Sequence, residues 1–129
     1  MKRLFLLALL ATACGPDDSF EVSLRGIEVA PNANSLSIWL HNPNRSCDEL
    51  RQQTASAQKV FTGVFGTTAS LGPNAKSIQI DPITRIHAGF YNVVAVASEG
   101  SSPQAFDCAS NIQVSDGKAT SLTLTLSTL

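Results

Sequence analysis

Alternation of apolar and polar residues with a period of two is the feature that most constrains how this chain folds. It is clearest near the C-terminus, where Leu122, Leu124 and Leu126 alternate with Thr123 and Thr125. Successive side chains of a β-strand point to opposite faces, so a strand places all three leucines on one side. The segment is therefore predicted to be a strand with one buried face.

A second strand is predicted just before the motif HNPN. Leu36, Ile38 and Leu40 share one face of it, and Trp39 and His41 share the other. If the second face is open to solvent, Trp39 and His41 form a possible binding site for a sugar ring or a partner protein. If the strand is central, Trp39 instead lies in a second core layer. The pattern alone leaves both interpretations open.

Other segments carry strand and turn signals. Residues 89–98 are apolar on both parities, which is typical of a strand covered on both faces. The alternation of residues 20–30 slips at Gly26, which predicts a β-bulge. Residues 60–86 are predicted to form two or three short strands, with turns at Gly66, at 72–74 and at Asp81-Pro82.

The Asp116-Gly117 pair predicts a hairpin turn, because this dipeptide readily adopts the positive φ values of tight turns. Before the turn, Cys108 shares its parity with Phe106 and Val114. Cys108 is therefore expected to face the core.

One segment departs from the strand pattern. Ser46 and Glu49 have the spacing of a capping box, and the residues that follow are good helix formers without Gly or Pro. This predicts one short helix from Cys47 to Ala57.

These elements predict an all-β fold, an antiparallel β-sandwich of about six to eight short strands with one short helix near 47–57. The spacing of an immunoglobulin domain is absent, because Trp39 precedes both Cys47 and Cys108. With 43% hydrophobic and 15% charged residues, the chain has the composition of an ordinary globular protein, and residues 20–129 are predicted to form one domain.

The C-terminal third also resembles a known class of module. The residues that carry the likeness are AGFYNVVAVA at 88–97 and CASNIQVSDGKATSLTLTL at 108–126. They are similar to the prealbumin-like, or carboxypeptidase-regulatory-like, β-sandwich modules of exported bacterial proteins. The resemblance implies a non-catalytic role in structure, attachment or binding. A helix after Cys47 is not part of that family's pattern.

The first fourteen residues are typical of an export signal. Lys2 and Arg3 precede an apolar run of about seven residues, too short to span a bilayer. The motif LLATAC at 9–14 resembles the lipobox of bacterial lipoproteins, with Ala11 at a position where that family prefers leucine. The alternative is an ordinary cleavage site beside a thiol.

The lipobox resemblance implies that residues 1–13 are a signal peptide and that Cys14 is lipidated. Residues 14–19 then form a tether, of which residues 15–19 span at most about 17 Å. More than one acyl chain gives stable anchoring in the bilayer. In that family, Gly15 after the cysteine favours the outer membrane of a Gram-negative cell.

Cys47 and Cys108 are then the remaining pair, and in an exported chain such a pair is expected to form a disulfide. A reactive or metal-binding pair is the alternative, but neither cysteine belongs to a CxxC motif or a Cys/His cluster. We therefore predict no metal site and no cofactor.

Charge and motifs argue against several classes of function. The net charge is −1 and no stretch is dense in Lys or Arg, so nucleic acid is not an expected partner. His41 and His87 are the two histidines, and neither lies beside a nucleophile motif such as GxSxG. An enzyme is not expected, although a triad assembled in space stays open.

The sequence thus predicts a membrane-anchored lipoprotein that acts as a non-catalytic structural or interaction module at the cell envelope. Its expected partners are the lipid bilayer, through acylated Cys14, and an envelope protein or glycan. Binding of a small ligand or glycan is the main alternative, and an envelope enzyme is the least favoured one.

Overall fold

The computed structural model describes residues 19–72 and 78–129. The predicted signal peptide, Cys14 and all of the predicted tether except Ser19 lie outside these residues. The described elements, in chain order, are β1 (Phe20–Arg25), the 3-10 helix η1 (Ile27–Val29), β2 (Ser35–His41), α2 (Cys47–Ala57), β3 (Phe65–Ser70), β4 (Ile78–Gln79), β5 (Gly89–Glu99), β6 (Ser102–Val114), β7 (Thr120–Thr125) and β8 (Ser127–Thr128).

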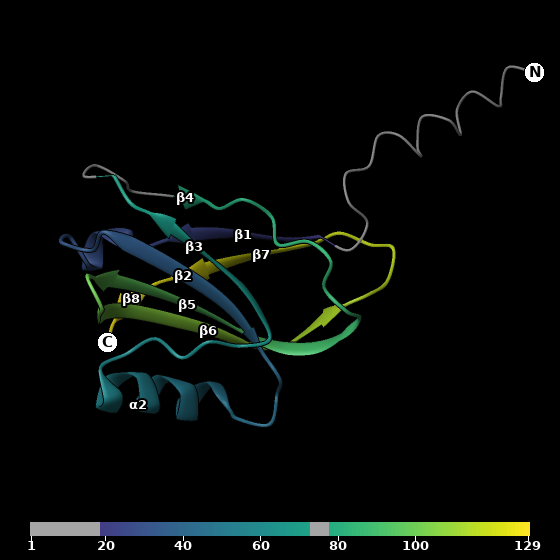
Figure 1. Ribbon diagram of the computed structural model, residues 1–129, viewed down its shortest axis with the longest axis horizontal. Coiled ribbons are helices and arrows are strands. Elements are labelled where there is room, and N and C mark those ends of the chain that lie inside the picture. Colours follow the sequence, from purple (N-terminus) through teal and green to yellow (C-terminus); the bar gives the residue numbers. More distant parts are fainter. Residues whose placement is uncertain (1–18, 73–77) are drawn as a thin grey trace, which may run out of the picture.

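Among the described residues the strands form two stacked sheets, accompanied by one α-helix, so the predicted all-β sandwich is confirmed (Figure 1). The larger sheet is antiparallel, with the order β3-β2-β5-β6-β8. The smaller sheet has the order β4-β1-β7. Its β1 and β7 pair in parallel, with Val22 opposite Leu122, which is a departure from a purely antiparallel arrangement.

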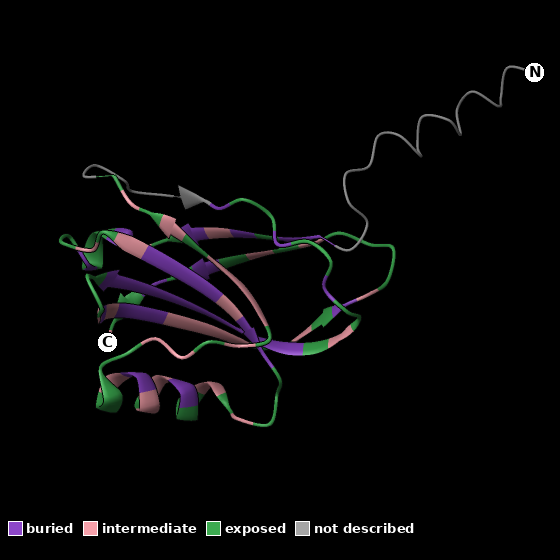
Figure 2. Ribbon diagram, in the orientation of Figure 1, coloured by how far each residue is buried: buried purple, intermediate pink, exposed green. Residues whose placement is uncertain are grey.

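The main core lies between the two sheets. The alternation predicted from the sequence provides the apolar side chains of this core, because every second side chain of β1, β2 and β7 points inward. β5 lies between β2 and β6 and is buried on both faces, as its apolar sequence predicts. Figure 2 shows this burial along the centre of the sandwich. The largest fully buried side chains of the core between the sheets are Phe20, Leu24, Leu36, Ile38, Leu40, Val93 and Val114.

A second, smaller core lies on the other face of the larger sheet, beneath α2. Leu50 of α2 packs there with Val94, Val96 and Phe106. The predicted helix and its capping box are confirmed: the Glu49 N–H donates to Ser46 Oγ at 3.1 Å, and the Ser46 N–H donates to Glu49 Oε1 at 3.0 Å. The helix ends before Gln58, whose φ is 53°. This face of β5 and β6 is thereby covered by helix instead of strand.

The predicted bulge at Gly26 is wrong, because β1 ends at Arg25. Gly26 has a φ of 80° and leads into η1. A Cβ at this position would lie 2.6 Å from the Leu126 carbonyl oxygen. Gly26 therefore permits both a left-handed turn and the close approach of the chain that follows β7.

The prediction that Asp116-Gly117 joins two paired strands in a hairpin is wrong. A turn does form, with a φ of 73° at Gly117 and a hydrogen bond of 3.3 Å from the Lys118 N–H to the Ser115 carbonyl. However, β6 belongs to the larger sheet and β7 to the smaller one. The turn carries the chain across the sandwich, because β7 pairs with the distant β1.

An unpredicted bulge in β6 changes which way Cys108 faces. The register slips opposite Tyr91 and Val93, where Asn111 adopts a φ of 54°. Cys108 and Phe106 consequently face α2, whereas Val114 beyond the bulge faces the main core. The prediction that Cys108 and Val114 share a face is wrong, because one extra residue inverts the parity.

Candidate functional site

The disulfide predicted between Cys47 and Cys108 is present. Its Cα atoms lie 5.6 Å apart, and it joins the first residue of α2 to the middle of β6. The Ser110 hydroxyl donates to Cys47 Sγ at 3.1 Å. The bond fixes the N-terminal end of α2 against the larger sheet, beside the loop that leads from β2 to α2.

Trp39 lies on the helix-covered face of the larger sheet, opposite the face of Leu36 and Leu40, as the alternation predicts. It is directly across from Gly66 of β3, and a Cβ on Gly66 would collide with the indole ring. Gly66 is inside a strand, so the turn predicted there is wrong. Trp39 is half-buried, so it is neither an open aromatic platform nor a fully buried core residue.

Two further turns were predicted, at residues 72–74 and at Asp81-Pro82. Residues 72–74 lie partly outside the described residues, and Asp81 and Pro82 occupy the irregular segment between β4 and β5.

His41, at the end of β2, is 5% exposed. Its ring hydrogen-bonds the backbone of Phe61, whereas Nε2 is buried and meets no partner among the described residues. Burial, and after it the positive charge of Arg45, lower the pKa of His41 from its ordinary 6.5, and the Phe61 bond opposes them. The neutral imidazole is therefore the form that this site favours near pH 7.

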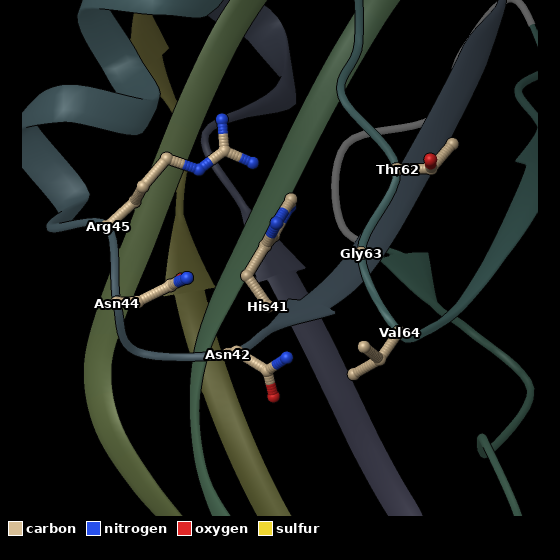
Figure 3. Close-up of a pocket in the computed structure, with 7 residues that line it drawn as sticks. All are labelled: His41, Asn42, Asn44, Arg45, Thr62, Gly63 and Val64. Atoms are coloured by element: carbon tan, nitrogen blue, oxygen red, sulfur yellow. The ribbon is translucent and has the colours of Figure 1, made fainter.

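A depression of about 270 Å³ opens beside His41 (Figure 3). It lies between the loop after β2 and the segment that leads into β3. Figure 3 shows the side chains of His41 and Arg45 extending toward the same space. None of the lining residues is acidic: they are His41, Asn42, Asn44, Arg45, Thr62, Gly63 and Val64.

Arg45 is held in place beside this depression. Its Nη1 donates to Gln53 Oε1 of α2 at 2.7 Å, and its guanidinium carbon lies 5.9 Å from the centre of the Phe61 ring. Neither partner carries a negative charge. The guanidinium N–H groups other than the one bonded to Gln53 are therefore suited to donate to a carboxylate or another anionic group.

Asn92 of β5 supports the loop that carries Arg45, and sequence reasoning did not single it out. Its Nδ2 donates to the Arg45 carbonyl at 2.7 Å, and its Oδ1 accepts from the Asn111 N–H at 3.0 Å. Asn92 is buried, and each of these bonds satisfies a polar group that burial removes from water. The available signal was an amide in an otherwise apolar strand.

His87 is not among the residues that line the depression. It is exposed, and its ring contacts the ring of Phe65 at a centroid distance of 5.7 Å. Its carbonyl accepts the Tyr91 hydroxyl at 2.6 Å. The two histidines of the chain therefore occupy different environments, one buried and one at the surface.

Comparison of the chain with protein-family models, curated proteins and solved structures gives no match. The chemistry of the site therefore rests on its own geometry. Within residues 19–72 and 78–129, no three His, Cys, Asp or Glu side chains gather where they could hold a metal ion. In the same part of the chain, no helix has the length and apolar character to cross a bilayer.

We expect His41 to make stability depend on pH. In the unfolded chain its pKa returns to about 6.5, so below that pH the unfolded state binds a proton that the folded state resists. The free energy of unfolding should therefore fall between about pH 7 and pH 5, and His41→Gln should reduce this dependence. Urea denaturation at both pH values measures it. A matched His87→Gln variant should keep the slope, and an unchanged slope in His41→Gln would contradict the assignment.

Proposed function

We propose that this protein is an exported bacterial lipoprotein, anchored in the outer membrane through acylated Cys14. Its β-sandwich serves as a non-catalytic module that binds an envelope protein or glycan. The contact site is the depression beside His41 and Arg45. The observation that carries the proposal is the guanidinium of Arg45, which is held by an uncharged amide and an aromatic ring where no carboxylate lines the site.

The anchoring part is supported by the lipobox-like motif and by the start of the fold. β1 begins at Phe20, and Ser19 is already buried. Few residues thus separate Cys14 from the first strand, and an extended chain covers at most about 3.5 Å per residue. The domain would lie close to the membrane surface, where its partner is also expected.

The binding part is supported by the preorganisation of the site. Because Arg45 is already held in one orientation, less side-chain conformational entropy is lost when a partner binds. Asn42 and Asn44 add amide groups on the same loop. His41, in contrast, bonds backbone and offers Nε2 to no hydroxyl or carboxylate of the described chain. The arrangement suits recognition of a carboxylate on the partner better than activation of a nucleophile.

The anchor is tested by Cys14→Ser. Without a thiol there is no acceptor for the diacylglycerol, so the variant should lose lipid labelling and move from the membrane to the soluble fraction. Density-gradient fractionation of the wild type should place it with outer-membrane markers. A Cys14→Ser chain that stays membrane-bound would contradict the lipid anchor.

The contact site is tested by Arg45→Gln, which keeps polarity and removes the charge. A hydrogen bond to a charged group contributes about 1.5–3 kcal/mol, so capture of a cross-linked envelope partner should fall by about tenfold or more. Quantitative mass spectrometry of the purified complexes measures the loss. Arg25→Gln, on β1 of the other sheet, is the matched control and should leave capture unchanged. Equal capture by both variants would place the contact elsewhere.

A further inference from the structure

We propose that two copies of this chain associate through β3, paired antiparallel about Thr68, so that their larger sheets form one continuous sheet. The observation behind this inference is an outer strand without the features that normally prevent edge pairing. β3 lies at one end of the larger sheet (Figure 1). Its sequence, FGTTAS, contains no charged residue and no proline, and its pairing with β2 shows no bulge. Such an edge is a template for another strand.

The direction of the β3 backbone groups follows from one hydrogen bond. The Leu71 N–H donates to the Asn34 carbonyl at 3.1 Å, in the same register as the β2–β3 pairs. Hydrogen-bonding groups alternate sides along an antiparallel strand. Phe65, Thr67 and Ala69 therefore bond β2, and the N–H and carbonyl groups of three alternate residues point outward: Gly66, Thr68 and Ser70.

These outward groups are self-complementary about a two-fold axis. When Thr68 faces Thr68 of the second copy, Gly66 faces Ser70, and each of these pairs exchanges two N–H···O bonds. No like charges meet, because all of the residues are neutral. Side chains opposite each other in an antiparallel pair point to the same face, so both α2 helices lie on one side of the joined sheet.

The other edge strands differ from β3. β4 and β8 are each two residues long. β7, at one end of the smaller sheet, also lacks charge and proline, but its Thr125 N–H already donates to the Asp107 carboxylate of β6 at 2.8 Å, which occupies part of that edge. β6 is partly covered by β8 and bears Asp107. Pairing through β3 alone gives a closed dimer, whereas a β3–β6 contact would propagate into a fibre.

A six-residue strand contact is small compared with the area of a stable interface. Confinement to a membrane raises the effective concentration of the partners and compensates for this. This compensation depends on the proposed anchor, whereas the pairing geometry does not. The experiment is therefore done twice, with the lipidated chain in vesicles and with the Cys14→Ser chain concentrated in solution.

The experiment uses Thr68→Cys. Across the two-fold axis the Cα atoms of a hydrogen-bonded pair lie about 5.5 Å apart, within the range that a disulfide bridges. Mild oxidation should convert most of the variant into a covalent dimer on a non-reducing gel. Retention of the Cys47–Cys108 bond, checked by peptide mapping, shows that the fold is intact.

Two matched control variants test the register of the β3–β3 pairing and the identity of the strand that pairs. Ser70→Cys is exposed on the same strand, but its Cα would lie about 14 Å from its symmetry mate and should not cross-link. Thr123→Cys is equally exposed on β7 and should also stay monomeric. Cross-linking of Thr68→Cys alone, in either preparation, supports the dimer. The proposal is overturned if Thr68→Cys cross-links in neither preparation, or if either control cross-links as efficiently.

Thr68→Lys gives a readout without introduced thiols. It places two ammonium groups together at the axis, so light scattering should show a shift from dimer to monomer at the same protein concentration. Thr123→Lys should leave the mass unchanged. A Thr68→Lys chain with the dimer mass would overturn the pairing, and circular dichroism shows whether both variants are folded.

Discussion

Replacing Cys47 and Cys108 by serine should lower the free energy of unfolding by about 4 kcal/mol. The bond closes a loop between residues 61 apart in sequence, and the chain-entropy model gives about this value for a loop of that length. A small domain has only about 5–15 kcal/mol in total. The double variant should thus unfold at a much lower urea concentration than the oxidised wild type.

The loss of local stability in the double variant should be greatest in α2. Besides the disulfide, α2 is held to the sheet mainly by Leu50, which packs in the second core, and by Arg51, which donates to the Thr128 carbonyl at 2.6 Å. Hydrogen exchange should become faster at α2 amides than at amides of β5. Wild type treated with a reductant is the control and should match the double variant. A stability loss below about 1 kcal/mol would show that the disulfide restricts the unfolded chain little.

Phe106→Ala should cost about 3–5 kcal/mol, the usual range for a phenylalanine removed from a core. Phe106 is 2% exposed and packs with Leu50, Val94 and Val96 beneath α2. The guanidinium carbon of Arg51 lies 5.5 Å from the centre of its ring. The substitution removes this packing and leaves a cavity between helix and sheet. Urea denaturation measures the change in the free energy of unfolding.

Phe90→Ala is the matched control on the adjacent strand. Phe90 is 52% exposed, and its truncation should change the free energy of unfolding by less than about 0.5 kcal/mol. Similar losses in the two variants would contradict the assignment of a second core to the helix-covered face.

Much of the local structure was predictable from the sequence. Alternation along 36–41 places Leu36 and Ile38 on one face and Trp39 on the other, because side chains of a strand point alternately. The capping box predicts the start of α2 at Cys47, because Ser46 and Glu49 satisfy each other's backbone N–H groups. These features depend on residues close together in the chain.

The candidate site was only partly predictable. His41 and Trp39 were found from their shared strand face, but the site places His41 with Arg45 and not with Trp39. Arg45 becomes a site residue because Gln53 and Phe61, from α2 and the segment after it, hold its guanidinium. Such contacts have no local signature in the sequence. The role of Asn92 likewise depends on a partner 47 residues away.

The sequence by itself determined the strand character of the described residues and the position of α2, because period and capping are local properties. It also predicted the pairing of Cys47 with Cys108, once Cys14 was set aside as the expected lipidation site. Tertiary structure decided which strands share a sheet and which face each one buries. The turn at Asp116-Gly117 is compatible with a hairpin, yet β7 pairs with β1, because long-range pairing and burial outweigh turn preference. The bulge at Asn111 likewise turns Cys108 toward α2, where its disulfide holds the helix against the larger sheet.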